Sequence, residues 1–100
     1  MQFDWDVAKA IQNRQKHGVT FDEATSVIFD PFAITTDDED HSEHEWRERT
    51  IGPSSRFRIL IVVHTERSGD VLRIISARKA DRQEAKDYEE EVKRRLSQNG

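Results

Sequence analysis

The chain has 100 residues, of which 36% are charged, and a formal net charge of −4. This length predicts a single domain over residues 1–100. The absence of cysteine excludes disulfides and cysteine-based metal centres. No apolar run approaches the ~20 residues of a membrane span, and the N-terminus lacks a signal-peptide pattern. We therefore expect a cytoplasmic protein without membrane contact.

The charge is distributed unevenly along the chain. Residues 1–53 carry 5 Lys/Arg against 12 Asp/Glu, whereas residues 54–79 carry 6 against 2. The acidic total argues against non-specific binding of nucleic acid over the whole surface. The basic excess in 54–79 predicts one basic patch on an otherwise acidic molecule.

Two helices are predicted near the N-terminus. Asp6 can cap a helix over residues 7–17, and Gly18 should end it in the left-handed conformation. A Thr-x-x-Glu capping box then opens a second helix over residues 20–29. That helix should end before Pro31, because the residue preceding a proline avoids the helical region.

The middle of the chain predicts a sheet, and the C-terminus a third helix. The helix should begin at Asp81 and fray over residues 97–100. QFDW, at residues 2–5, is a possible short edge strand. The expected fold is α+β, with two N-terminal helices, a four-stranded, mainly antiparallel sheet and a C-terminal helix. The four strands are predicted over residues 31–36, 46–52, 56–65 and 71–79.

The last predicted strand ends in two adjacent cations, Arg78 and Lys79, within the sequence RIISARKAD. Strict alternation puts Arg78 on the face of Ile74 and Lys79 on the face of Ala77. The two cations should therefore serve different faces of the sheet. Arg78 either lines an anion site or pairs with an acidic residue of the following helix, such as Glu84.

The segment DDEDHSEHE, residues 37–45, has no apolar residue and is predicted to be an exposed acidic loop. Its two histidines, His41 and His44, and its carboxylates are suitable ligands for zinc or manganese. Their spacing matches no specific ligand motif, so a solvated loop without metal is the favoured interpretation. Docking of a basic partner is a further alternative.

Lys16 and His17 occupy the last turn of the first predicted helix. Cations at this position complement the helix dipole, which explains them without any function. Histidine is also a natural general acid or base, since its ordinary pKa is near 6.5. The chain has no phosphate-binding glycine loop, paired-carboxylate signature or serine elbow. The residues alone thus predict a small α+β domain with a basic patch.

Several blocks follow one another in a distinctive order: FDWDVAKAIQNRQKHGVTFDEA, DP, DHSEHE with a following arginine and TIG, RILIVVHTE, and RIISARKADRQEAKDYEE. Together, over roughly residues 2–91, they resemble the BrnT family of small bacterial toxins, which have a RelE-like fold. The resemblance implies a ribonuclease that arrests translation. It also implies a BrnA-like ribbon-helix-helix antitoxin in a 2:2 complex, through which alone operator DNA would be bound.

The resemblance further implies a site in which the ribose 2′-OH attacks the adjacent phosphate without a metal or other cofactor. Such a reaction needs proton transfer and cations that hold the phosphate. His17 is then the proton-transfer candidate, Arg47 and Arg78 stabilise phosphate charge, and Lys16 is a phosphate contact or acid. The catalytic residues implied are Lys16, His17, Arg47, Arg78 and Glu45, and the substrate contacts are Arg58, Lys79 and His64.

Two features fit the resemblance less directly. Glu48 and Arg49 are charged where the family strand should be apolar, so we expect them to face solvent on an edge strand. His64 recurs in the HTE block, but we expect it to lie far from Arg78 along the hairpin, which leaves its role open. A non-catalytic module that binds a protein through the basic sheet and acidic loop is the alternative function.

Overall fold

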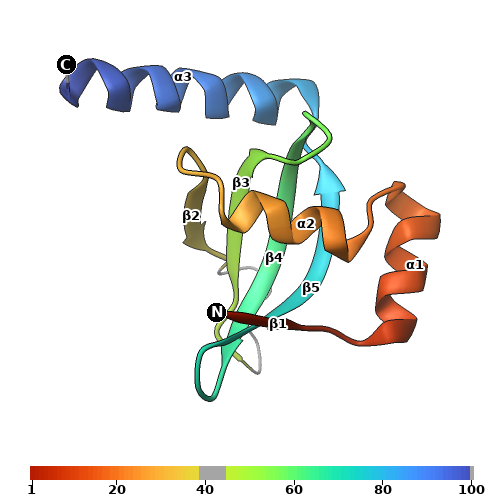
Figure 1. Ribbon diagram of the computed structural model, residues 1–100. Helices are drawn as coiled ribbons and strands as arrows, with labels where there is room; N and C mark the ends of the chain where they lie inside the picture. Colours follow the sequence, from red (N-terminus) through yellow and green to blue (C-terminus); the bar gives the residue numbers. More distant parts are fainter. Residues whose placement is uncertain (39–44, 100) are drawn as a thin grey trace.

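The computed structural model describes residues 1–38 and 45–99. Figure 1 shows α2 crossing one face of a sheet, α1 standing beside β5, and α3 lying across the end of the sheet where β5 finishes. Within the described ranges, none of the helices is long and apolar enough to cross a membrane. The elements are β1 (Gln2–Asp4), α1 (Val7–His17), α2 (Phe21–Ile28), β2 (Ile34–Asp37), β3 (Glu48–Pro53), β4 (Ile59–Arg67), β5 (Val71–Lys79) and α3 (Arg82–Asn99).

The sheet has five strands in the order β1-β5-β4-β3-β2. The α+β prediction is confirmed, but the four-stranded, mainly antiparallel sheet is wrong, because β1 adds a fifth strand parallel to β5. Contacts at both ends hold β1 there: the N-terminal ammonium lies 2.8 Å from Asp70, and Asp4 pairs with Arg73. The expectation that the strand containing Arg49 is an edge is also wrong, since β3 lies between β2 and β4.

Helix ends follow the predicted signals. The Asp6 side chain accepts a hydrogen bond from the Lys9 amide, and Gly18 ends α1 with φ +69°. Thr20 accepts a hydrogen bond from the Glu23 amide at the start of α2. The helix α3 extends from Arg82 to Asn99.

The hydrophobic core lies between α2 and one face of the sheet. Gly52 on β3 permits the close approach of the segment after α2, because a Cβ there would lie 3.1 Å from both Cα and Cβ of Ala33. The core residues come from α2, the segment before it, β4 and β5. They are Val19, Phe21, Ala24, Val27, Leu60, Val62, Leu72, Ile74 and Ala77.

A β-bulge in β5 changes which residues face the core. The register passes from the pair Val63–Ser76 to the pair His64–Ile74, which leaves Ile75 without a partner. The extra residue reverses the alternation, so Ala77 joins Ile74 in the core. The strict parity predicted for this strand, with these two residues on opposite faces, is therefore wrong.

Asn13 holds α1 against β5. Its amide nitrogen donates to the Ala77 carbonyl at 2.8 Å, and its amide oxygen accepts from the Ala77 amide at 3.1 Å. The same nitrogen donates to the Val19 carbonyl at 3.0 Å. The side chain is 7% exposed. The Asn13 side chain thus makes the pair of hydrogen bonds that a neighbouring strand would make, on the edge of β5 past the residues that pair with β1.

Asn13→Ala should destabilise the protein by about 2–4 kcal/mol, because it leaves buried backbone groups of Ala77 without partners. Chemical denaturation followed by circular dichroism measures the change. Gln15→Ala, at an exposed position of the same helix, should change the free energy of unfolding by less than about 0.5 kcal/mol. Equal stability of the two variants would contradict the role given to Asn13.

Candidate active site

A cleft of about 380 Å³ opens on the sheet face that points away from α2. Its floor includes Ile61 and Val63, which alternate along β4 with the core residues Leu60 and Val62. Cations and a histidine dominate its walls. The lining residues are Lys16, His17, Asp38, Arg47, Arg49, Ile61, Val63, Ile75, Ser76 and Arg78.

The C-terminal turn of α1 supplies Lys16 and His17 to this cleft. Both lie one helical turn after Asn13, at the i+3 and i+4 positions that share a helix face. The hydrogen bonds of Asn13 to Ala77 therefore place this turn beside the end of β5. Gly18 ends the helix immediately afterwards, so His17 is its last residue.

The chain around the start of β3 supplies two arginines. Arg47 precedes the strand, and its carbonyl accepts a hydrogen bond from the Asp38 amide at 2.9 Å. Arg49 follows two residues later and lies on the same side of the chain, as alternation requires. Arg49 thus lines the cleft with a side chain that is 41% exposed, but the strand that carries it is not the edge we expected. The spacing of two residues between Arg47 and Arg49 is the sequence signal that could have predicted this position.

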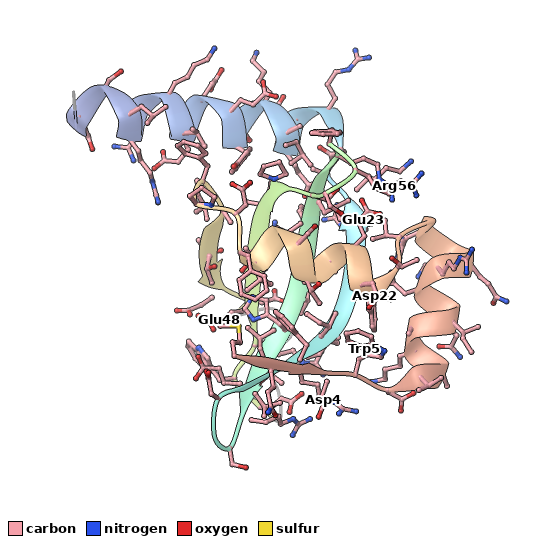
Figure 2. The ribbon with its side chains drawn as sticks, viewed as in Figure 1. Asp4, Trp5, Asp22, Glu23, Glu48 and Arg56 are labelled. Atoms are coloured by element: carbon pink, nitrogen blue, oxygen red, sulfur yellow. The ribbon has the colours of Figure 1, made fainter. Side chains whose placement is uncertain are left out.

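Glu48 points to the other face of β3, where His64 is its partner on β4. It is half-buried rather than solvent-facing. Burial raises the pKa of Glu48, and the neighbouring carboxylates of Glu66 and Asp37 raise it further. The side chain is labelled in Figure 2.

Arg78, from the end of β5, makes a bidentate ion pair with Glu84 of α3. Its Nη1 donates to Glu84 Oε1 at 2.7 Å and its Nη2 to Oε2 at 2.9 Å. The Arg49 Nη2 lies 3.9 Å from Glu84 Oε2. The hydrogen bonds from Arg78 are the main reason that the pKa of Glu84 falls to about 2. Arg78 thus pairs with Glu84, as one of the two sequence interpretations expected, and it also lines the cleft.

Four of the predicted site residues therefore meet in one cleft: Lys16, His17, Arg47 and Arg78. Glu45 is outside the lining, but its Oε1 lies 3.6 Å from Arg47 Nε and its Oε2 lies 3.5 Å from Arg67. Sequence reasoning did not select Arg49, Asp38 or Ser76 for this site.

The structure does not bring Arg58 and Lys79 to the cleft. Arg58 pairs with Glu23 of α2 and donates to the Gly18 carbonyl at 3.2 Å. Figure 2 shows Glu23 on α2, and Ser54 also donates to its carboxylate, at 2.7 Å. Lys79 is exposed and pairs in register with Leu60, whose side chain is in the core. It therefore points to the α2 side of the sheet, opposite to Arg78.

His64 lies on the core face of the sheet and is 3% exposed. Its Nε2 and Thr50 Oγ1 share a hydrogen bond of 2.7 Å, and Thr50 is in turn 2.7 Å from Thr35 Oγ1. Arg78 pairs with Ile61, three residues from His64 along β4. Strand length does not separate His64 from Arg78, contrary to our expectation. The two residues are separated because their side chains point to opposite faces of the sheet, and His64 is absent from the cleft lining.

Most of the predicted acidic loop, residues 39–44, lies outside the described residues. His41 and His44, its candidate metal ligands, lie outside the described residues. Among residues 1–38 and 45–99, no group of three or more His, Asp or Glu side chains could hold a metal ion. Asp38 lines the cleft from the described end of this segment.

This site is suited to an anionic ligand, because three arginines, a lysine and a histidine surround a partly apolar floor. Guanidinium groups bind phosphate oxygens with directed hydrogen bonds, and histidine transfers protons near neutral pH. The fold and the cleft together define a small α+β protein with the donors needed for phosphate chemistry.

Comparison with known proteins gives the family. Residues 5–84 match the family described as "Ribonuclease toxin, BrnT, of type II toxin-antitoxin system", and the chain belongs to this family of ribonuclease toxins. The fold is similar to the crystal structure of the Brucella abortus ribonuclease toxin BrnT, with TM-score 0.64 and 24% identity. That match covers 82% of this chain and 99% of the Brucella chain. No curated protein matches the sequence.

The buried His64 makes stability depend on pH. Burial lowers the pKa of His64 from 6.5 to about 4, so between these values the unfolded state binds more protons than the folded state. Stability is then full above pH 6.5 and declines as the pH falls toward 4. Acidification from pH 7 to 5 should cost about 2 kcal/mol through this group.

His64→Gln keeps a hydrogen-bonding group near Thr50 but cannot titrate. We expect this variant to lose about 2 kcal/mol less than the wild-type protein between pH 7 and 5. Urea denaturation at both pH values measures the difference. Identical pH dependence in the two proteins would show that His64 is not held in its neutral form.

Proposed function

We propose that this ribonuclease toxin cleaves RNA by metal-independent attack of a ribose 2′-OH on the adjacent phosphate, and thereby inhibits translation. The observation that carries the proposal is the convergence of Lys16, His17, Arg47 and Arg78 on one cleft from three separate parts of the chain. Transfer within RNA needs no external nucleophile, so a proton acceptor, a proton donor and cations on the phosphate suffice.

The roles follow from the chemistry of each side chain. His17 takes the proton of the 2′-OH or delivers one to the leaving 5′-oxygen, because an imidazole can act as either base or acid near neutral pH. Arg47 and Arg78 offer N–H donors to the phosphate oxygens as negative charge builds in the transition state. Lys16 adds a further contact to the phosphate or serves as the acid.

Two further residues support this arrangement. Arg49 adds a cation to the same cleft, and Glu45 orients Arg47 through the contact at 3.6 Å. The apolar floor formed by Ile61 and Val63 suits a ribose or base more than a second phosphate. Arg58, Lys79 and His64 are left out of the mechanism, because each lies outside the cleft.

A cognate antitoxin is the expected partner, since the family belongs to type II toxin–antitoxin systems. We propose a BrnA-like ribbon-helix-helix antitoxin, a 2:2 complex, a RelE-like mode of action and operator binding through the antitoxin alone. Covering a strongly cationic cleft with acidic or apolar antitoxin residues would block RNA and neutralise like charges at once. Co-expression with the adjacent reading frame, followed by light scattering of the complex, tests the partner and the stoichiometry.

Induced expression in a bacterial host tests the proposed activity. It should arrest growth and yield RNA fragments with 2′,3′-cyclic phosphate ends, and co-expressed antitoxin should relieve the arrest. The purified protein should still cleave a labelled RNA when EDTA removes divalent metal and spermidine replaces magnesium. Growth without arrest and intact RNA would instead favour the non-catalytic binding module.

Arg78→Ala should lower the cleavage rate by about 10²–10³-fold, because it removes a donor that stabilises charge in the transition state. The rate is measured on labelled RNA with enzyme in excess. Arg56→Ala is the matched control, since Arg56 carries the same charge at an exposed position outside the cleft. An Arg78→Ala protein with unchanged melting temperature and full toxicity would contradict the role of Arg78.

A further inference from the structure

The carboxylate of Glu84 joins three parts of the molecule. It accepts two hydrogen bonds from Arg78 at the end of β5, at 2.7 and 2.9 Å. Its Oε2 lies 3.9 Å from Arg49 of β3. Its own place is fixed by a reciprocal capping box with Asp81, in which each backbone amide donates to the other side chain, at 2.9 and 2.8 Å.

A fixed carboxylate matters here because the arginines it contacts are long and carry like charges. A free arginine side chain loses about 2 kcal/mol of rotamer entropy when it is held in one position. Two guanidinium groups on one wall of a cleft also repel each other. A carboxylate shared between the two guanidinium groups offsets this repulsion. It also holds the arginine side chains in place before RNA binds, so less side-chain entropy is lost on binding.

The pairing leaves Arg78 able to act. A guanidinium group carries five N–H donors, and Glu84 takes one from each terminal nitrogen. The remaining donors include the Nε–H edge, which is a second two-pronged face suitable for a phosphate. The Arg78 side chain is 42% exposed, whereas that of Glu84 is 25% exposed.

We infer that Glu84 is a positioning residue for RNA cleavage: it holds Arg78, and with it Arg49, in the orientation that meets the phosphate of the transition state. This inference rests on the proposed ribonuclease mechanism and adds a residue of α3 to it. Glu84 touches no reacting atom and acts through the arginines.

Glu84→Gln tests the inference, because the amide keeps the shape of the side chain and loses its charge. Glu91→Gln is a matched control on the same helix, since Glu91 also accepts hydrogen bonds from two arginines, Arg94 and Arg95. Neither of those arginines lines the cleft. Both substitutions remove one negative charge from α3, so a general effect of charge is common to the two variants.

In Glu84→Gln, RNA cleavage should slow down while RNA binding is not weakened. The cleavage rate of a labelled messenger RNA in a translation extract, with toxin in excess, should fall about tenfold. Binding of random-sequence RNA with 2′-O-methyl ribose, which cannot be cleaved, should stay equal or become tighter, since the variant is more positive. Glu91→Gln should show the same binding and a cleavage rate within twofold of wild type.

A double-mutant cycle tests whether Glu84 acts through Arg78. In an Arg78→Ala background, Glu84→Gln should lower the remaining rate by less than twofold, instead of about tenfold. Fully additive losses would overturn the inference, as would a single variant that cleaves as fast as Glu91→Gln. Cleavage faster than wild type would also overturn it, because Glu84 would then be an anion that competes with the RNA phosphate.

A failure of the proposed ribonuclease mechanism can be distinguished from a failure of the positioning role of Glu84. A wild-type protein that leaves the RNA intact contradicts the ribonuclease mechanism itself. A wild-type protein that cleaves while Glu84→Gln behaves like Glu91→Gln contradicts only the positioning role. A Glu84→Gln protein that loses both RNA binding and thermal stability would show a structural role for Glu84 and would overturn the inference as well.

Discussion

The site depends on the hydrogen bonds between the Asn13 side chain and the backbone of Ala77. They hold α1 against the edge of β5 that faces away from β4, beyond the residues of β5 that pair with β1. Hydrogen bonds are directional, so these bonds set the distance between the end of α1 and the end of β5. Lys16 and His17 follow Asn13 by one turn, and Arg78 follows Ala77 by one residue. One buried amide thus sets two sides of a cleft relative to each other.

The protein is acidic as a whole, but its cleft is basic. The chain as a whole is acidic, with a net charge of −4, yet the cleft gathers three arginines and a lysine on one face. Carboxylates behind the arginines make this arrangement stable: Glu84 contacts Arg78 and Arg49, and Glu45 lies near Arg47. The arginines remain partly exposed, so they can still meet an anionic substrate while their positions are fixed from behind.

The β-bulge at Ile75 decides which side chains of β5 reach the cleft. Ala77 turns into the core, while Ile75, Ser76 and Arg78 line the cleft. Bulges often occur beside functional sites because they redirect a side chain without ending the strand. Here the bulge lets a buried strand present Arg78 to the cleft close to its end.

Local chemistry made much of the fold predictable. Asp6, Gly18 and Thr20 place the helix ends, and β5 matches its predicted bounds, because caps and apolar periodicity act within a few residues. The family resemblance also pointed to Lys16, His17, Arg47 and Arg78, which the structure brings to one cleft. Physical reasoning from the residues alone reached only a basic patch on a sheet.

The sequence by itself determined the α+β class, the helix boundaries and the types of side chain available for phosphate chemistry. Only the tertiary structure decided which of them meet. The parallel pairing of β1 with β5 and the interior place of β3 are contacts between distant segments, which no local pattern specifies. The burial of His64 and the pairing of Arg58 with Glu23 separate these two residues from the cleft. Faces of a sheet are set by register, and a single unpaired residue in β5 was enough to change them.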